Sequence, residues 1–209
     1  KEIEQVKETV FLGVVLDENL SWRSHIAYTA NKISKSIGII HKSSFFLNKV
    51  SLRILYFSMI YPYLQYCNLV WANTYQTNIS RLLILQKRII RIINKSDFIA
   101  HTNPIFKNLY LLKLEDIRKL QISQFMFMIR NNNSLINFQD MFILNNQIHS
   151  YNTRSSKLFH LPRARTKIRQ YSIKYQGPVI FNSLSNDIKE SVTYSSFTKK
   201  LKSHLISKY

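Results

Sequence analysis

The chain has 209 residues, with 30 Lys and Arg against 11 Asp and Glu, so its formal net charge is +19. Five of the acids lie in the first twenty residues, and the strongly cationic remainder favours polyanionic partners. The shortage of carboxylates argues against a self-contained metal-dependent polymerase or nuclease, and the three glycines argue against a Gly-rich nucleotide-binding loop.

The N-terminal part predicts a strand followed by a long helix. Residues 9–16 are apolar and rich in β-branched side chains, and the polar residues 17–19 are a turn signal. A strand that is apolar on both faces normally lies inside a sheet. Apolar residues at spacings of three and four then predict a helix over residues 22–41, with Lys32 and Lys35 off its apolar stripe.

Two further helices are predicted over residues 51–61 and 78–94, and Pro62 should kink or end the first of them. Residues 63–71 are almost wholly apolar and aromatic and should be buried. The helix over 78–94 carries many bases, and the sequence has no acid between residues 19 and 96. This face is either solvated or a nucleic-acid contact. Its bases are Arg81, Lys87, Arg88, Arg91 and Lys95.

The second half of the chain predicts a loop over 101–110, which contains Pro104, and helices over 114–130 and 135–144. Near the C-terminus, Gly177-Pro178 predicts a break. A short helix over 179–185 and a basic helix over 196–207 should follow it.

Residues 141–186 contain no acid, and we expect loops and short strands there. Aromatic side chains alternate with the bases of this segment, so residues 151–175 could bind phosphates and unstacked bases; the alternative is an unstructured basic linker. The aromatic residues and histidine concerned are Tyr151, Phe159, His160, Tyr171 and Tyr175. The bases are Arg154, Lys157, Arg163, Arg165, Lys167, Arg169 and Lys174.

Other residues limit the chemistry that the chain can perform. The single cysteine, Cys67, excludes a disulfide framework and a cysteine zinc site, and favours an intracellular location, nucleus or cytoplasm. No window reaches about 18 uninterrupted apolar residues, so we expect no membrane span. We predict no catalytic residue, no metal ligand and no cofactor within this chain.

Six motifs follow one another along the chain. They are FLGVVLDENLSWRSHI (11–26), LRILYFSMIYPYLQYCNLVWA (52–72), LLILQKRIIRII (82–93), HTNPIFKNLYLLKLEDI (101–117), IHSYNTRSSKLFHLPRART (148–166) and SIKYQGPVIFNSLSNDIK (172–189). Their order and spacing resemble the C-terminal part of the reverse transcriptase of jockey-like non-LTR (LINE) retrotransposons.

The resemblance implies that residues 11–16 belong to the primer grip, a β-hairpin at the end of the palm that holds the primer 3′ end. Phe11, Leu12 and Gly13 carry that match. It also implies a helical thumb along the template–primer duplex, and a C-terminal region that engages element RNA and target DNA. The fingers and palm, with the catalytic aspartates and their Mg²⁺, would lie upstream and be partners of this chain.

The sequence therefore predicts a mainly α fold: a helical thumb-like bundle (21–145), preceded by a short palm-edge strand or hairpin (1–20) and followed by a small basic α+β tail (146–209). We expect it to bind RNA, an RNA–DNA hybrid or a DNA duplex, with no polymerase activity of its own. The alternatives are a non-enzymatic nucleic-acid binder or functionless fragment of a decayed element, and a stand-alone metal nuclease. The predicted backbone contacts are Lys32, Lys35, Arg81, Lys87, Arg88, Arg91, Arg154, Arg163, Arg165 and Arg169.

Overall fold

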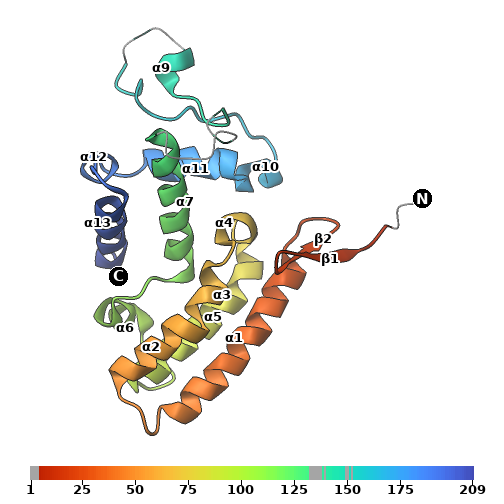
Figure 1. Cartoon of the computed structure of the whole chain (residues 1–209), viewed down its shortest axis with the longest axis vertical. Helices are drawn as coiled ribbons and strands as arrows, with labels where there is room; N and C mark the ends of the chain where they lie inside the picture. The colour runs from red at the N-terminus through yellow and green to blue at the C-terminus, as the bar shows by residue number, and fades with distance from the viewer. Residues whose placement is uncertain (1–4, 132–137, 139, 149–150, 152) are drawn as a thin grey trace. The chain divides into compact units, whose positions relative to one another are not determined.

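The computed structural model describes residues 5–131, 138, 140–148, 151 and 153–209. In its described residues it is mainly helical, with one two-stranded antiparallel hairpin, which confirms the predicted mainly α fold with an N-terminal hairpin; the thumb-like character of the bundle stays a prediction (Figure 1). The chain divides into two compact units: residues up to Ile117 together with Tyr209, and Arg118–Lys208. The division falls inside a helix rather than near residue 145. The three predicted functional segments do not coincide with these units and remain a prediction.

The apolar run at residues 9–16 folds back on itself. Strand β1 (Glu8–Phe11) pairs antiparallel with β2 (Val14–Asp17). Leu12 and Gly13 form the turn with φ of 46° and 78°, and two central residues with positive φ are typical of a tight hairpin turn. All of β1 is exposed, and only Val14 of β2 is buried. The expectation of one strand inside a sheet is therefore wrong, because Gly13 reverses the chain midway.

Three long helices of the first unit agree with the predicted ones: α1 (Arg23–Ser43), α2 (Lys49–Met59) and α5 (Gln76–Asn94). Their apolar stripes are buried, and α1 packs along α5. The carbonyl oxygen of Ser21, just before α1, accepts a hydrogen bond from Asn78 in the first turn of α5. The two helices thus begin close together and run in the same direction (Figure 1).

The segment 63–71 is only partly buried, which corrects the prediction. It forms the short helices α3 (Tyr61–Gln65), with Pro62 in its first turn, and α4 (Asn68–Trp71). Leu64 and Trp71 are buried, but Tyr63, Tyr66 and Val70 are exposed. One-turn helices can bury only one side, so the aromatic side chains on the other side face solvent.

The predicted loop at 101–110 is also wrong, because these residues form helix α6 (Thr102–Leu109). Pro104 lies in its first turn, where a proline loses no intrahelical hydrogen bond. Ile105, Phe106 and Leu109 are buried. The next helix, α7 (Leu114–Arg130), has the predicted bounds.

Gln86 of α5 holds the first unit together from inside. Its Nε2 donates to the Tyr56 hydroxyl at 3.0 Å and to the Leu112 carbonyl at 2.9 Å, and its Oε1 accepts from the backbone N–H of Leu114 at 2.9 Å. The side chain is fully buried and both ends of its amide are used. Gln86 therefore ties α5 to α2 and to the start of α7. Tyr209 belongs to the same unit, and its hydroxyl accepts from the backbone N–H of Lys113 at 3.0 Å.

The second unit contains most of α7 and several shorter helices. Gly177-Pro178 lies buried inside one of them, α11 (Ile173–Asn182), so the predicted break is wrong. The predicted helix 179–185 overlaps the C-terminal part of α11. Of the predicted helix 135–144, residues 135–137 and 139 lie outside the described ones, and the described residues 140–144 are not helical, so the prediction is wrong there. The helices of the tail are α9 (Asn145–Ile148), α10 (Lys167–Tyr171), α11 (Ile173–Asn182), α12 (Asn186–Lys189) and α13 (Tyr194–Ser207).

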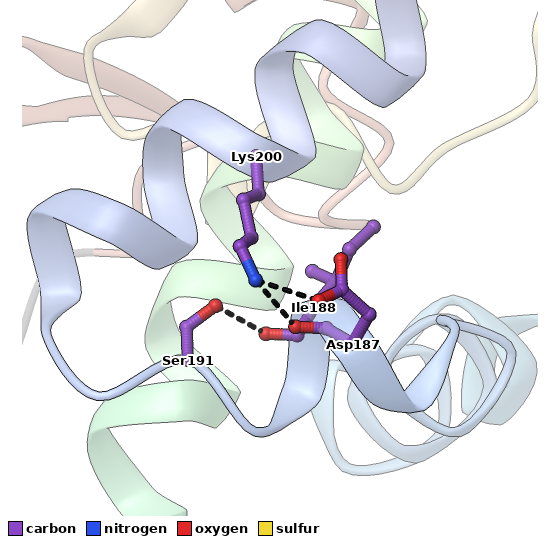
Figure 2. Close-up of polar contacts among 4 residues, drawn as sticks. All are labelled: Asp187, Ile188, Ser191 and Lys200. Atoms are coloured by element: carbon purple, nitrogen blue, oxygen red, sulfur yellow. Dashed lines mark hydrogen bonds and ion pairs between the residues drawn. The ribbon is translucent and has the colours of Figure 1, made fainter.

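The sequence predicts a small α+β tail, with loops and short strands over residues 141–186. In the described part of residues 146–209 the regular elements are instead helices, and β pairing is limited to an isolated bridge between Leu144 and Phe159. Helix α12 is joined to α13 by Lys200, whose Nζ donates to the carboxylate of Asp187 at 2.7 Å and to its backbone carbonyl at 3.1 Å (Figure 2). Ser191 donates to the Ile188 carbonyl at 2.8 Å and closes the turn between the two helices.

Candidate nucleic-acid interface

Helix α5 presents a row of exposed bases. Arg81, Arg88 and the C-cap residue Lys95 are exposed and seven residues apart. Seven residues are about two helical turns, so the Arg81 and Arg88 side chains leave the same face about 10 Å apart, and Lys95, whose backbone is left-handed, follows at the end of the helix. The apolar residues of α5 lie on the opposite face and are buried.

Helix α1 adds bases beside this row. Asn31, Lys35 and Lys42 share one face of α1 because they are four and seven residues apart, and all three are exposed. The Arg81 guanidinium donates to the Asn31 side chain at 3.4 Å, so this face borders the exposed row of α5. We call the combined surface the basic stripe. It consists of Lys35, Lys42, Arg81, Arg88 and Lys95.

The stripe keeps its positive charge because the sequence offers little to neutralise it. No acid occurs between Glu18 and Asp97, so neither helix carries a carboxylate. Like charges on one face repel each other. This repulsion is relieved when the surface binds a polyanion, which brings several negative charges at once.

Three other predicted contacts of the first unit are half-buried or contact a neighbouring side chain. The Lys32 amine lies over the Tyr28 ring, 5.4 Å from its centre, at the border of the stripe's face on α1, because Tyr28 and Lys35 are seven residues apart. Arg91 is half-buried and its Nε donates to the carbonyl of Ala100 at 2.9 Å. Lys87 is half-buried as well. Of the bases predicted in this unit, the stripe contains Lys35, Arg81 and Arg88.

In the second unit, the described part of 151–175 is anchored rather than an unstructured linker. Phe159 is buried, and the Asn182 side chain accepts from its backbone N–H at 3.1 Å and donates to its carbonyl at 2.8 Å. The Phe159 ring packs edge-on against Phe181, so it is not available to stack on a base. The predicted arginines of this unit are all exposed: Arg154, Arg163, Arg165 and Arg169.

The residues matched to the primer grip lie at the tip of the hairpin. Phe11 and Leu12 are 64% and 73% exposed. The Tyr66 hydroxyl donates to the Leu12 carbonyl at 2.5 Å, which fixes the tip against the start of α4. At the hairpin's base, Ser24 donates a short hydrogen bond to Glu8. The hairpin is thus fastened to the helices at both ends.

Neither a metal centre nor a membrane segment is seen in the described residues. Over that part of the chain, no three His, Cys, Asp or Glu side chains gather where they could hold a metal ion. No helix there combines the length and apolar composition that a membrane crossing requires.

Comparisons of the chain with protein families, with curated proteins and with solved structures find no match. The assignment to a reverse transcriptase therefore stays a proposal based on the motifs.

Sequence reasoning missed parts of the interface. Lys42 joins the stripe although it was not among the predicted contacts, and Lys95, named among the bases of its helix, was not chosen as a contact; whether a helical base is exposed depends on which neighbours pack beside it. Their spacing of seven from Lys35 and Arg88 was the signal that could have found them. The role of Asn182, 23 residues from Phe159 along the chain, left no local signal.

Proposed function

We propose that the chain binds the phosphate backbone of an RNA–DNA hybrid, or of an RNA or DNA duplex, through the basic stripe. We further propose that it does so as the nucleic-acid-binding portion of an RNA-directed DNA polymerase of a non-LTR retrotransposon. The observation that carries the binding proposal is the row Arg81, Arg88 and Lys95 of α5 beside Lys35 and Lys42 of α1. Guanidinium and ammonium groups form charge-assisted hydrogen bonds with phosphate oxygens.

The length of the stripe suits a duplex. From residue 81 to residue 95 a helix rises about 21 Å, and one strand of a duplex carries about six phosphates over that length. The exposed arginines of the second unit would extend the contact if they bind the same nucleic acid. A shared contact of six to ten phosphates would lower affinity roughly 10³- to 10⁵-fold between 50 and 200 mM salt.

The polymerase part of the proposal rests on the order of the six motifs. The catalytic aspartates would lie in an upstream palm, so the chain by itself is expected to have no polymerase activity. A stand-alone nucleic-acid binder would show the same binding. The coding sequence upstream separates the two, because only the polymerase requires an open frame that encodes a strand with paired aspartates.

The decisive experiment measures binding of a hybrid and of a DNA duplex as a function of salt. Arg88→Gln should weaken binding to every sequence and reduce the slope of log K against log salt by about 1. Lys107→Gln removes an exposed base on α6, outside the stripe, and should change the slope little. Arg165→Gln asks whether the second unit contributes. Affinity that hardly changes between the two salt concentrations, or equal slopes for Arg88→Gln and the wild type, would refute the proposal.

A further inference from the structure

A pocket of about 460 Å³ lies beside the hairpin tip in the first unit. The turn residues Leu12 and Gly13 form one wall, and helices α1, α2 and α3 form the others. Its volume is within the range of small-ligand sites. It lies next to the face of α1 that carries Lys35 and Lys42, because Tyr28, which lines the pocket, is seven residues before Lys35.

The walls of this pocket are aromatic. Tyr28, Tyr63 and Tyr66 line it, and their side chains are 45%, 37% and 52% exposed. Each therefore has a free surface although it contributes to a concave site. Exposed tyrosine rings around a hollow are the arrangement on which unstacked nucleobases stack, since every base offers a π face.

A polar group inside the pocket has a defined hydrogen-bonding state. His25 lines the pocket and is buried, and burial lowers the pKa of its imidazole, so the ring is neutral near pH 7. Its Nδ1 accepts a hydrogen bond from the backbone N–H of Val15 at 3.3 Å. A neutral imidazole that accepts at Nδ1 carries its proton on Nε2. This N–H makes no hydrogen bond among the described residues, and the His25 ring also packs against Trp71, with the two ring centroids 5.5 Å apart.

The charge at the rim completes the site. The Lys32 amine is 5.4 Å from the centre of the Tyr28 ring, which lines the pocket. A ligand with an aromatic body, an edge that accepts a hydrogen bond and an attached anion would use all three features. A nucleobase with its phosphate has this composition, whereas an apolar peptide side chain would leave both His25 and Lys32 without partners.

We propose that this pocket holds one unstacked nucleobase of a bound strand, with the tyrosine rings on its faces, the His25 Nε2–H at its edge and Lys32 near its phosphate. The inference deepens the proposed function and rests on it: the basic stripe would hold the duplex backbone, and the pocket would take a base from a single-stranded end.

The test uses a single-stranded oligonucleotide that carries one 2-aminopurine, whose fluorescence is quenched when the base stacks. The wild-type chain should quench it on binding. Tyr63→Leu keeps an apolar side chain but removes the π face, so it should weaken single-strand binding about 5- to 100-fold and reduce the quenching. Tyr28→Leu removes a second wall and should act in the same direction.

Tyr194→Leu is the matched control, because Tyr194 is 46% exposed at the start of α13 in the second unit and should change affinity by less than about twofold. Affinity for a blunt duplex shows whether each variant remains folded and should not change. If Tyr63→Leu and Tyr28→Leu bind and quench as the wild type does while salt-dependent duplex binding persists, the pocket proposal fails alone. If the wild type binds neither nucleic acid, the proposed function fails with it.

Discussion

The Asp17 carboxylate organises the turn that leads into helix α1, six residues before the first helical residue. Trp22, next to the helix, has a left-handed conformation and makes no side-chain cap. The Asp17 carboxylate instead accepts backbone hydrogen bonds from Asn19 at 3.2 Å and from Ser21 and Trp22 at 2.9 Å. Partial burial raises the pKa of this carboxyl, but the hydrogen bonds from Ser21, Trp22 and Asn19 outweigh it, so the pKa is below its ordinary value.

The stabilising effect of Asp17 should therefore depend on pH. Because the pKa is lower in the folded state, the stabilisation is complete above the unfolded-state pKa of about 4 and is lost as pH falls through the folded value. We expect Asp17→Asn to reduce the free energy of unfolding by about 1 kcal/mol at pH 7. The reduction should become smaller as the pH falls, because the wild-type carboxylate is then increasingly protonated. Urea unfolding at a series of pH values measures the difference between variant and wild type.

Asp97→Asn is the control, since Asp97 is an exposed carboxylate in the turn after α5. Its effect should be small at every pH. A cost of Asp17→Asn that is the same at pH 3 and pH 7 would show that the charge of Asp17 does not stabilise the start of α1.

At the scale of the elements, two helical glycines should respond oppositely to the same change. A Cβ on Gly177 of α11 would be 2.6 Å from the Met126 Sδ and 3.3 Å from the Phe142 ring, whereas a Cβ on Gly38 of α1 would meet nothing within 4 Å. Alanine is the better helix former at both sites, by about 0.5–1 kcal/mol. Gly38→Ala should therefore be stabilising, while Gly177→Ala should destabilise by about 1–3 kcal/mol because Met126 is buried and must shift.

Denaturant unfolding of the two variants measures whether each substitution raises or lowers the free energy of unfolding. A stabilising Gly177→Ala would mean that α11 and α7 separate easily and that Gly177 is not required for their close approach. A destabilising Gly38→Ala would contradict the open surface seen beside α1.

The same elements show what the sequence could predict. Spacings of three and four residues located α1, α2, α5 and α7 because each buries one continuous apolar face. Proline and glycine misled the interpretation where they lie inside helices: Pro104 occupies a first turn, and Gly177 allows a close helix contact. These roles depend on position in the element and on neighbours distant in sequence.

For the candidate site, the excess of bases could be predicted from the sequence, but their grouping on one surface could not. Arg91 and Arg88 are three residues apart on one helix, yet the Arg91 guanidinium donates to the carbonyl of Ala100 and Arg88 is exposed. Likewise, the mostly apolar composition of residues 63–71 predicts that Tyr63 and Tyr66 are buried, yet both are exposed. Exposure of a side chain is decided by tertiary packing, which local composition does not report.

At the scale of the whole molecule, the net charge opposes folding as well as favouring polyanions. With +19 on 209 residues, the folded chain holds repelling charges closer together than the unfolded chain does. Replacing Lys35 and Arg88 together by Glu removes two positive charges and adds two negative ones, so the net charge falls by four to +15. Both side chains are exposed, so the core is unchanged.

We expect this double variant to bind nucleic acid more weakly while its unliganded thermal midpoint rises by about 2 °C at low salt, because self-repulsion is reduced. The gain should disappear near 1 M salt, where the screening length is about 3 Å. Lys35→Arg with Arg88→Lys keeps the charge and should leave the midpoint unchanged. Thermal unfolding of the double variant and the wild type at the two salt concentrations measures the effect. A lower midpoint of the double variant at low salt would mean that the bases of the stripe stabilise the fold. Its weaker binding would then be explained by unfolding.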